Sequence, residues 1–528
     1  MSTRIRRRIL HLMLLLPCSL AAVACLVSVS SGVTAKPIES SERVPGYEVK
    51  SPVKAHLLDG STVVYADGIV VRSDHIAART EAHRYGVLNE PLSVSDVPLD
   101  SIVGLESYER RLNYPGSFIV STLSVVGTLI AAAGLAVAIF GSCPTVYADS
   151  AGVPVLQAEV FARRISPLLE ARDIDLLHAR PDSAGVLTLE VRNEALETHY
   201  INHFELLEVR HARGRRVIPD EHGRPLIVGA FMPPASARDR AGRDVRETLA
   251  RADGNVFSTD SGTLSRAGAD DPGDHIDFAV PRPAGGGDSA VVGLRLRSSL
   301  LNTVLLYDMM LAGPGARSLD WLERDMRQIG PMLQFANWHR KYFGLRVSVW
   351  DGKAYREIER HPEYGPVAWR EAATVVPVLE QDSLRVRLSF TADEWRIDWV
   401  GVAPDFSRPR PRLISVSGVR AANDSVASVV ARNLRSADDR YVQTSPGERF
   451  WVTFATGPAP RDSARTFLLA SQGYYSEWLR PSWIEGAKDT ATFVPSAGSL
   501  AAALHRWSTE RDSLDRSFFS TRIPMRQP

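Results

Sequence analysis

The stretch LRVRLSFTADEWRIDWVGV, residues 384–402, indicates the fold class of the C-terminal half of the chain. Apolar and polar residues alternate over 384–390 and again over 395–402, as they do in strands that bury one face. Asp351-Gly352-Lys353 separates two further strand-like runs, which is a hairpin signature. Antiparallel strands at this spacing favour a β-sandwich, so residues 290–485 are predicted to form a sandwich-like domain.

The two runs of this stretch also resemble the paired strands of galactose-binding-like sandwiches. In that family a Trp-x-Ile-Asp-x-Val strand closes the sheet, and residues 395–400 here read Trp-Arg-Ile-Asp-Trp-Val. The resemblance implies that 384–390 pairs with 395–402.

The rest of this half contains two predicted helices and a loose segment. A helical apolar spacing predicts a helix over 318–343, although Gly330-Pro331 should break or kink it. Residues 499–518 are predicted to be a polar helix on the surface. Residues 232–289 are rich in Pro, Gly, Asp and Arg, which predicts a flexible linker or long loop, and the preceding segment 143–231 is predicted to be β-rich.

Near the N-terminus, residues 45–112 predict a small β unit. Asp-Gly pairs at 59–60 and 67–68 separate short alternating runs, which is a hairpin signal. These strands, followed by the closing run PLDSIVGLE, resemble an Sm-like small barrel of bacterial envelope proteins. The resemblance implies an oligomerisation or binding module.

Residues 117–140 contain no charge and are long enough to cross a bilayer as a helix. A stripe of small residues could let such helices pack and self-associate: Gly127, Ala131, Gly134, Ala138 and Gly141. An Ala/Gly-rich span of ordinary composition, and a run buried inside protein, remain as alternatives. The predicted fold class is mainly β with a few helices: a small β-barrel-like unit, one transmembrane helix, then β-sandwich-type domains.

A second hydrophobic segment begins the chain. Four arginines precede an apolar run to Val29, so residues 1–35 are predicted to be a signal peptide or N-terminal anchor. Cys25 follows Ala-Val-Ala, which resembles a bacterial lipoprotein cleavage box with Ala in place of the usual Leu. Lipidation of Cys25 and an unlipidated anchor both remain open. The basic start would place residues after 143 inside, whereas Arg110 and Arg111 before the span would place them outside.

The location is better indicated than the chemistry. The segments GSCPTVY and EVRNEALETHYINHFELLEVRH resemble an uncharacterised family of bacterial membrane-anchored envelope proteins, which implies a location in the cell envelope, with the later domains predicted on the extracytoplasmic side. A formal net charge of +1 gives no sign of nucleic acid as a partner. Three cysteines, two of them in the first hydrophobic segment, provide neither a disulfide framework nor a cysteine-ligated metal site.

No catalytic, metal or cofactor motif is recognised. His199 and His203 stand four apart, but the segment adjoins strands, where that spacing suits a shared ion poorly. The aspartates of 260–277 lack the order of a calcium loop. Gly-x-Ser-x-Gly and phosphate-binding glycine motifs are absent from the sequence. We therefore predict no catalytic residues, no metal site and no cofactor.

Aromatic residues gather in the C-terminal half and suggest a binding surface. Those beside predicted turns or at a sandwich rim are the predicted ligand-binding residues: Trp369, Tyr474, Tyr475 and Trp478. The predicted function is a membrane-tethered envelope protein that acts as a non-catalytic binding or scaffolding module for glycan or protein. The alternatives are an envelope hydrolase, with Asp398 paired with Glu394 or Glu371, and a membrane-anchored sensor.

We expect the chain to fractionate with membranes, because it has two independent hydrophobic segments. If Cys25 is lipidated, deletion of 117–140 should not release the chain into the soluble fraction. Fractionation of the deletion variant, together with lipid labelling of Cys25→Ser, measures this. Release of the deletion variant, or unchanged labelling of Cys25→Ser, would exclude the lipid anchor.

Overall fold

The computed structural model describes residues 31–38, 42–112, 144–477 and 493–520, with short internal gaps. The described residues are mainly β with several helices, which confirms the predicted class at that level. Among them, no helix is both long and apolar enough to cross a membrane. Residues 117–140 with their stripe of small residues, and Cys25, lie outside the described part of the chain.

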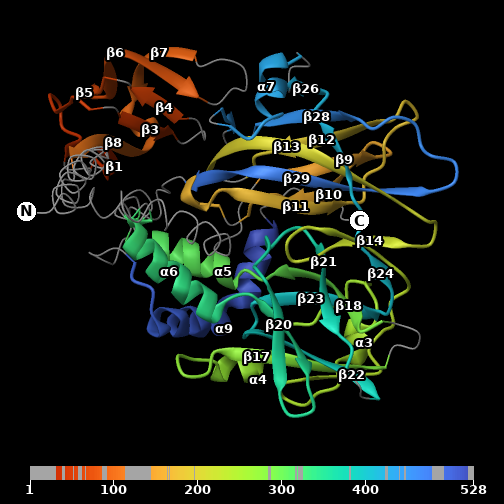
Figure 1. Cartoon of the computed structure of the whole chain (residues 1–528). Helices are drawn as coiled ribbons and strands as arrows, with labels where there is room; N and C mark the ends of the chain where they lie inside the picture. The colour runs from red at the N-terminus through yellow and green to blue at the C-terminus, as the bar shows by residue number, and fades with distance from the viewer. Residues whose placement is uncertain are drawn as a thin grey trace, which may run out of the picture.

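The N-terminal unit is one sheet, drawn in red and orange in Figure 1. Its strands run in the order β1 (Ser31–Pro37), β8 (Ile102–Leu112), β3 (Val53–Leu57), β4 (Thr62–Tyr65), β6 (His75–Tyr85), β5 (Ile69–Val71) and β2 (Glu48–Val49), and β7 (Leu92–Pro98) also pairs with β6. The inner side chains Val53, Val63, Tyr65 and Ile76 are fully buried. The unit starts before the predicted 45–112, because β1 pairs with β8 and lies partly in the segment predicted as signal or anchor.

The first sandwich is built from two distant parts of the chain. One sheet has the order β10 (Val153–Glu159), β9 (Thr145–Ser150), β12 (Val186–Arg192), β28 (Arg449–Ala455) and β26 (Gly418–Ala421). The facing sheet has the order β11 (Ala171–Leu177), β29 (Ala464–Glu477), β13 (Glu197–His211) and β25 (Arg412–Ser415), with β27 (Val442–Thr444) beside β13. Leu189, Phe204 and Phe450 are buried between the sheets. Residues 144–211 and 412–477 therefore form one unit.

The second sandwich lies in the sequence between those two parts. One sheet has the order β16 (Ser236–Asp239), β17 (Gly273–Pro281), β22 (Ser383–Thr391), β19 (Leu345–Trp350) and β20 (Tyr355–His361). The facing sheet has the order β21 (Arg370–Pro377), β18 (Ser289–Ser298) and β23 (Trp395–Ala403). Phe278, Leu294 and Trp395 belong to the core between them.

The pairing implied for residues 384–402 is wrong. β22 pairs with β17 and β19, whereas β23 pairs with β18 in the opposite sheet. The short turn between them crosses the sandwich, and Asp393 in this turn takes a positive φ of 59°. Alternation shows which face of a strand is buried, and both strands bury their apolar face in the same core.

The predicted linker over 232–289, with domain boundaries at 231 and 290, is also wrong, because this segment is part of the second sandwich. Residues 232–289 contain β16, β17 and two short helices, α3 (Arg246–Leu249) and α4 (Ser261–Arg266). Their few large apolar side chains, among them Leu249, Phe257 and Ile276, are buried. Asp260 caps α4 by accepting hydrogen bonds from two backbone N–H groups. The polar composition that suggested a linker thus belongs to folded structure.

A small middle sheet joins the two sandwiches. It consists of β14 (Arg216–Pro219), β15 (Pro225–Val228) and β24 (Phe406–Ser407). Val217 packs on the outer face of the first sandwich beside Leu207 and Leu468, whereas the next residue, Ile218, packs on the second sandwich beside Val291. Because successive side chains of a strand point to opposite faces, one thin sheet packs on both sandwiches. Figure 1 shows β14 and β24 between them.

A second contact between the sandwiches involves Glu159 of β10. Its carboxylate accepts hydrogen bonds from the backbone N–H groups of Val367 (2.9 Å) and Ala368 (3.1 Å) in the loop before β21. A Cβ at Gly365 would lie 2.0 Å from a Glu159 oxygen, so the loop can approach this carboxylate only with glycine there.

Helices cover the side of the sandwiches, in green and dark blue in Figure 1. They include α5 (Leu301–Val304), the π-helical segment η4 (Leu305–Leu311), α6 (Ile329–Tyr342) and α9 (Ala497–Ser520). The predicted helix over 318–343 is confirmed over α6, Pro331 lies in the first turn of α6, where proline is tolerated, and Ser318, Trp321 and Asp325 before it are also helical. The predicted polar C-terminal helix is instead anchored, because Leu500, Leu504 and Trp507 are fully buried.

Candidate functional site

The junction of the two sandwiches contains an open cleft of about 1100 Å³. Its walls come from β11, the turn between β14 and β15, the end of α6, β20, and the start of β21. Charged residues of both signs line it: Arg172, Asp173, Asp220, Glu221, Arg224, Arg340, Lys341, Glu357, Glu359, Arg360, Arg370, Glu371 and Arg408. It is therefore a site for polar and charged groups.

Arg370 ties the two sandwiches together at this cleft. Its guanidinium, on β21, lies 3.0 Å from the Asp173 carboxylate and also bonds Asp175, both on β11 of the first sandwich. It also lies over the Tyr364 ring, 4.6 Å from the ring centroid. Burial raises the pKa of Asp175 to about 7, opposed by Arg370 and reinforced by the Asp173 charge. One cation is thus shared between two carboxylates.

The turn at 220–224, which joins β14 to β15, is held rigidly by hydrogen bonds. Asp220 accepts hydrogen bonds from the backbone N–H groups of His222 (3.0 Å) and Arg224 (2.8 Å), and from the Arg224 side chain. Gly223 has a φ of 74°, and a Cβ there would lie 2.8 Å from Ile174. These contacts fix where Glu221 and His222 stand.

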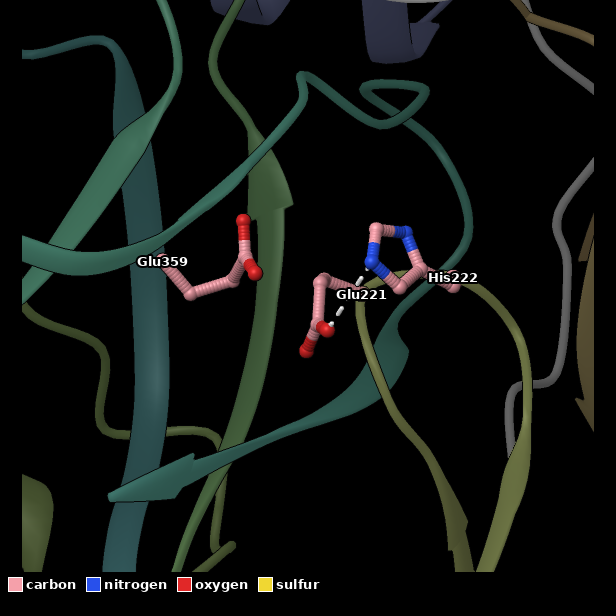
Figure 2. Close-up of side chains that lie close together, drawn as sticks. All are labelled: Glu221, His222 and Glu359. Carbon is pink, nitrogen blue, oxygen red and sulfur yellow. Dashed lines mark ion pairs between the residues drawn. The ribbon is translucent and has the colours of Figure 1, made fainter. Parts of the chain in front are cut away.

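Glu359 on β20 faces this turn and completes a candidate metal-binding trio (Figure 2). One ligand atom from each of Glu221, His222 and Glu359 lies within 4.8 Å of the other two. Burial raises the pKa of Glu221, and the nearby Asp220 and Glu359 carboxylates raise it further. Sequence analysis predicted no metal site, because Glu359 lies far from Glu221 and His222 in the sequence.

None of the three described residues from the predicted ligand face lines the cleft. Trp369 is half-buried, with the Arg295 and Arg297 guanidinium groups 5.4 and 5.0 Å from its ring centroid. Tyr474 stacks on Tyr200, with ring centroids 4.6 Å apart.

Tyr475, which sequence analysis expected to be exposed, is fully buried and belongs to the core beneath the helices. Its hydroxyl donates to the Ala162 carbonyl. Alternation along β29 accounts for the difference, since Tyr474 and Tyr475 point to opposite faces. Trp478 lies outside the described residues.

The carboxylates proposed for a hydrolase have separate structural partners. Asp398 is fully buried and accepts from the Gly254 backbone N–H and from Arg295. Glu394 accepts from the backbone N–H groups of Gly344 and Thr391, and burial raises its pKa. Of the three, only Glu371 lines the cleft, where it binds Arg216.

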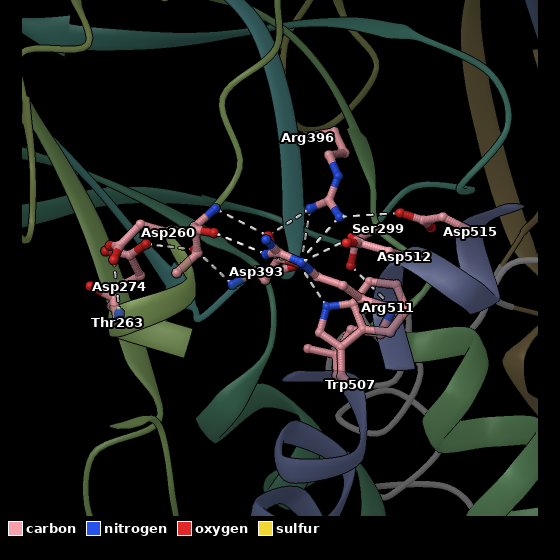
Figure 3. Close-up of polar contacts among 12 residues, drawn as sticks. Asp260, Thr263, Asp274, Ser299, Asp393, Arg396, Trp507, Arg511, Asp512 and Asp515 are labelled. Carbon is pink, nitrogen blue, oxygen red and sulfur yellow. Dashed lines mark hydrogen bonds and ion pairs between the residues drawn. The ribbon is translucent and has the colours of Figure 1, made fainter. Parts of the chain in front are cut away.

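A second polar cluster, shown in Figure 3, surrounds Asp393. The buried Asp393 carboxylate accepts hydrogen bonds from the Thr259 backbone N–H (3.0 Å), Arg396 (2.8 Å) and the Trp507 indole (2.7 Å). Arg511 of α9 adds an ion pair at 3.5 Å. Because this carboxylate is fully engaged, the cluster anchors α9 to the second sandwich, and the cleft remains the candidate site.

Comparisons with known proteins add no identification. No family model and no curated protein matches the chain. A rhamnosidase from Novosphingobium sp. PP1Y matches with a TM-score of 0.19 and 11% identity, over 70% of this chain and 28% of the other. A GH31 alpha-xylosidase from Xanthomonas citri matches with a TM-score of 0.16 and 9% identity, over 83% and 38%. The chain thus spans well under half of either structure, and such low scores support no inference.

Asp175→Asn should change how stability depends on pH. The folded carboxyl has a pKa of about 7, against an ordinary 3.8, so between these pH values the folded state keeps a proton that the unfolded state has released. Stability contributed by this proton is therefore lost as pH rises, by at most about 1.4 kcal/mol per pH unit. Urea unfolding at pH 5 and pH 8 should show that the free energy of unfolding of Asp175→Asn, relative to that of wild type, is higher at pH 8 than at pH 5. The same change in free energy of unfolding between the two pH values in both proteins would contradict this.

Asp393→Ala should destabilise the protein by about 3–5 kcal/mol, because it leaves buried cationic and indole donors without their acceptor. Asp393→Asn should cost less, since Asn tolerates positive φ and keeps an acceptor oxygen. Asp512→Ala, which removes an exposed carboxylate of α9, is the control and should change stability by less than about 0.5 kcal/mol. Equal effects of Asp393→Ala and Asp512→Ala in chemical denaturation would show that the cluster does not anchor α9.

Proposed function

We propose that this chain is a membrane-tethered protein of the bacterial envelope that binds a charged segment of a partner protein in the junction cleft, as a non-catalytic binding or scaffolding module. The hydrophobic segments at 9–29 and 117–140 support the tether, and the resemblance to envelope proteins supports the location.

The charged lining of the cleft is the observation that carries this proposal. Backbone hydrogen bonds and buried ion pairs hold many of these side chains in place, so an incoming chain meets preset charges of both signs. Lys341 and Arg340 are exposed on the last turn of α6, and Arg408 is exposed just before Pro409, on the way to β25. A peptide with acidic and basic side chains complements such a surface.

A protein segment fits this lining better than a neutral glycan does. Sugar rings are bound largely by stacking on open aromatic faces, combined with hydrogen bonds. Among the described cleft residues, Tyr364 is the one phenolic ring, and Arg370 covers it. Trp369, Tyr474 and Tyr475, the described members of the predicted ligand-binding set, lie elsewhere.

Site-specific photocrosslinking in cells would test the proposal with the full-length chain. A photoreactive residue at Asn337, an exposed cleft position, should form a defined protein adduct. The same residue at Leu413, which is 57% exposed and outside the cleft lining, is the matched control and should form none.

The double variant Arg340→Glu/Lys341→Glu should remove the adduct at 337 while leaving the unfolding transition nearly unchanged, because both side chains are exposed. Equal adducts at 337 and 413, or an adduct that survives the charge reversal, would reject the cleft as the site. A carbohydrate adduct in place of a protein adduct would favour a glycan ligand.

A further inference from the structure

The candidate metal-binding trio at the wall of the junction cleft comes from two elements of the fold. Glu221 and His222 lie on the turn between β14 and β15, and Glu359 reaches them from β20 of the second sandwich (Figure 2). The His222 Nε2 atom is 3.4 Å from a Glu221 carboxylate oxygen. Ligands of a tetrahedral zinc ion lie about 3.4 Å apart, given metal–ligand bonds near 2.1 Å. The first two ligands therefore already have this spacing, and Glu359 needs only a small side-chain movement.

The surroundings of Glu221 independently favour a bound cation. Its side chain is only 9% exposed, and its carboxylate receives no hydrogen bond from another side chain or from another residue's backbone among the described residues. Its nearest partners are the His222 imidazole at 3.4 Å and the Arg224 guanidinium at 3.6 Å, both weak contacts compared with a charged hydrogen bond. A carboxylate with so little exposure normally has several close donors, because burying a charge is costly.

Glu221 also faces negative charge. One Glu359 oxygen accepts a hydrogen bond from the Arg360 backbone N–H, and the other accepts none from the described part of the chain. Two carboxylates that face one another repel, and a divalent ion between them removes both the repulsion and the unmet bonding of Glu221.

The donor set selects the kind of metal. One imidazole nitrogen with two carboxylates suits zinc, whereas calcium and magnesium prefer oxygen ligands alone. His222 is 60% exposed, so metal can reach the site from the cleft. We propose that Glu221, His222 and Glu359 form a zinc-binding site on the wall of the junction cleft, with a remaining coordination position open to water or to a ligand.

This inference does not require that the cleft binds a partner protein. A zinc ion here would link the middle sheet to β20, and its charge would neutralise the two carboxylates of the trio. An open coordination position would accept a carboxylate or phosphate oxygen of whatever enters the cleft.

Zinc titration of the purified full-length chain in detergent tests the site. Wild type should bind one Zn²⁺ per chain in competition with a chromogenic chelator, and Co²⁺ should give the strong visible absorption of a tetrahedral site. His222→Ala and Glu359→Gln should each weaken zinc binding by about tenfold or more. Binding should also weaken on acidification, because imidazole and carboxylates coordinate only after losing their protons.

Two variants serve as matched controls. His505→Ala removes an exposed histidine elsewhere, and Glu357→Gln removes a cleft carboxylate outside the trio; both should leave zinc affinity unchanged. Since His222 is exposed, its replacement should not disturb folding, which thermal unfolding without metal would verify. Unchanged affinity in His222→Ala and Glu359→Gln, binding only at millimolar zinc, or preference for Ca²⁺ over Zn²⁺ would each overturn the proposal.

Discussion

The architecture depends on strand pairing between residues that are far apart in the sequence. β12 and β13 pair with β28 and β29, and the Asn193 side chain donates to the Thr444 carbonyl across 251 residues. Because the first sandwich closes only through these pairs, the 200 or so residues between its halves must leave and return at neighbouring points. The second sandwich occupies that interval, the middle sheet fills the gap between the two bodies, and the cleft lies where their edges meet.

Local sequence signals predicted the strands well but not their partners. Alternation over 384–402 indicated two half-buried strands, and both exist, yet they lie in facing sheets because a period of two encodes a face and not a neighbour. Composition misled over 232–289, where few apolar residues are present but nearly all the large ones are buried. The pattern over 318–343 predicted helical structure but not its division, since α6 begins at Ile329 and Trp321 and Asp325 before it lie in π-helical segments.

The candidate site was still less accessible from sequence. Its charged groups come from at least six segments separated by up to a few hundred residues, and each group alone has the appearance of an ordinary surface charge. Of the aromatic residues predicted to bind a ligand, Trp369 packs against arginines, Tyr474 stacks on Tyr200, and Tyr475 lies in the core. The signal that could have been noticed is the Glu-His pair in a tight Asp-x-x-Gly turn, which presents two metal-binding side chains in a fixed position.

The insertion of one sandwich within the other also has a consequence for biosynthesis. A chain made from its N-terminus exposes β9 to β13 first, but their partners in 412–477 emerge only after the whole second sandwich has been made. The inserted body holds all its strands between 236 and 403 and can close before the outer one, so the usual order of domain folding is reversed. Until then, the long β13 has open hydrogen-bonding edges, which makes the nascent outer sandwich a natural client for chaperones.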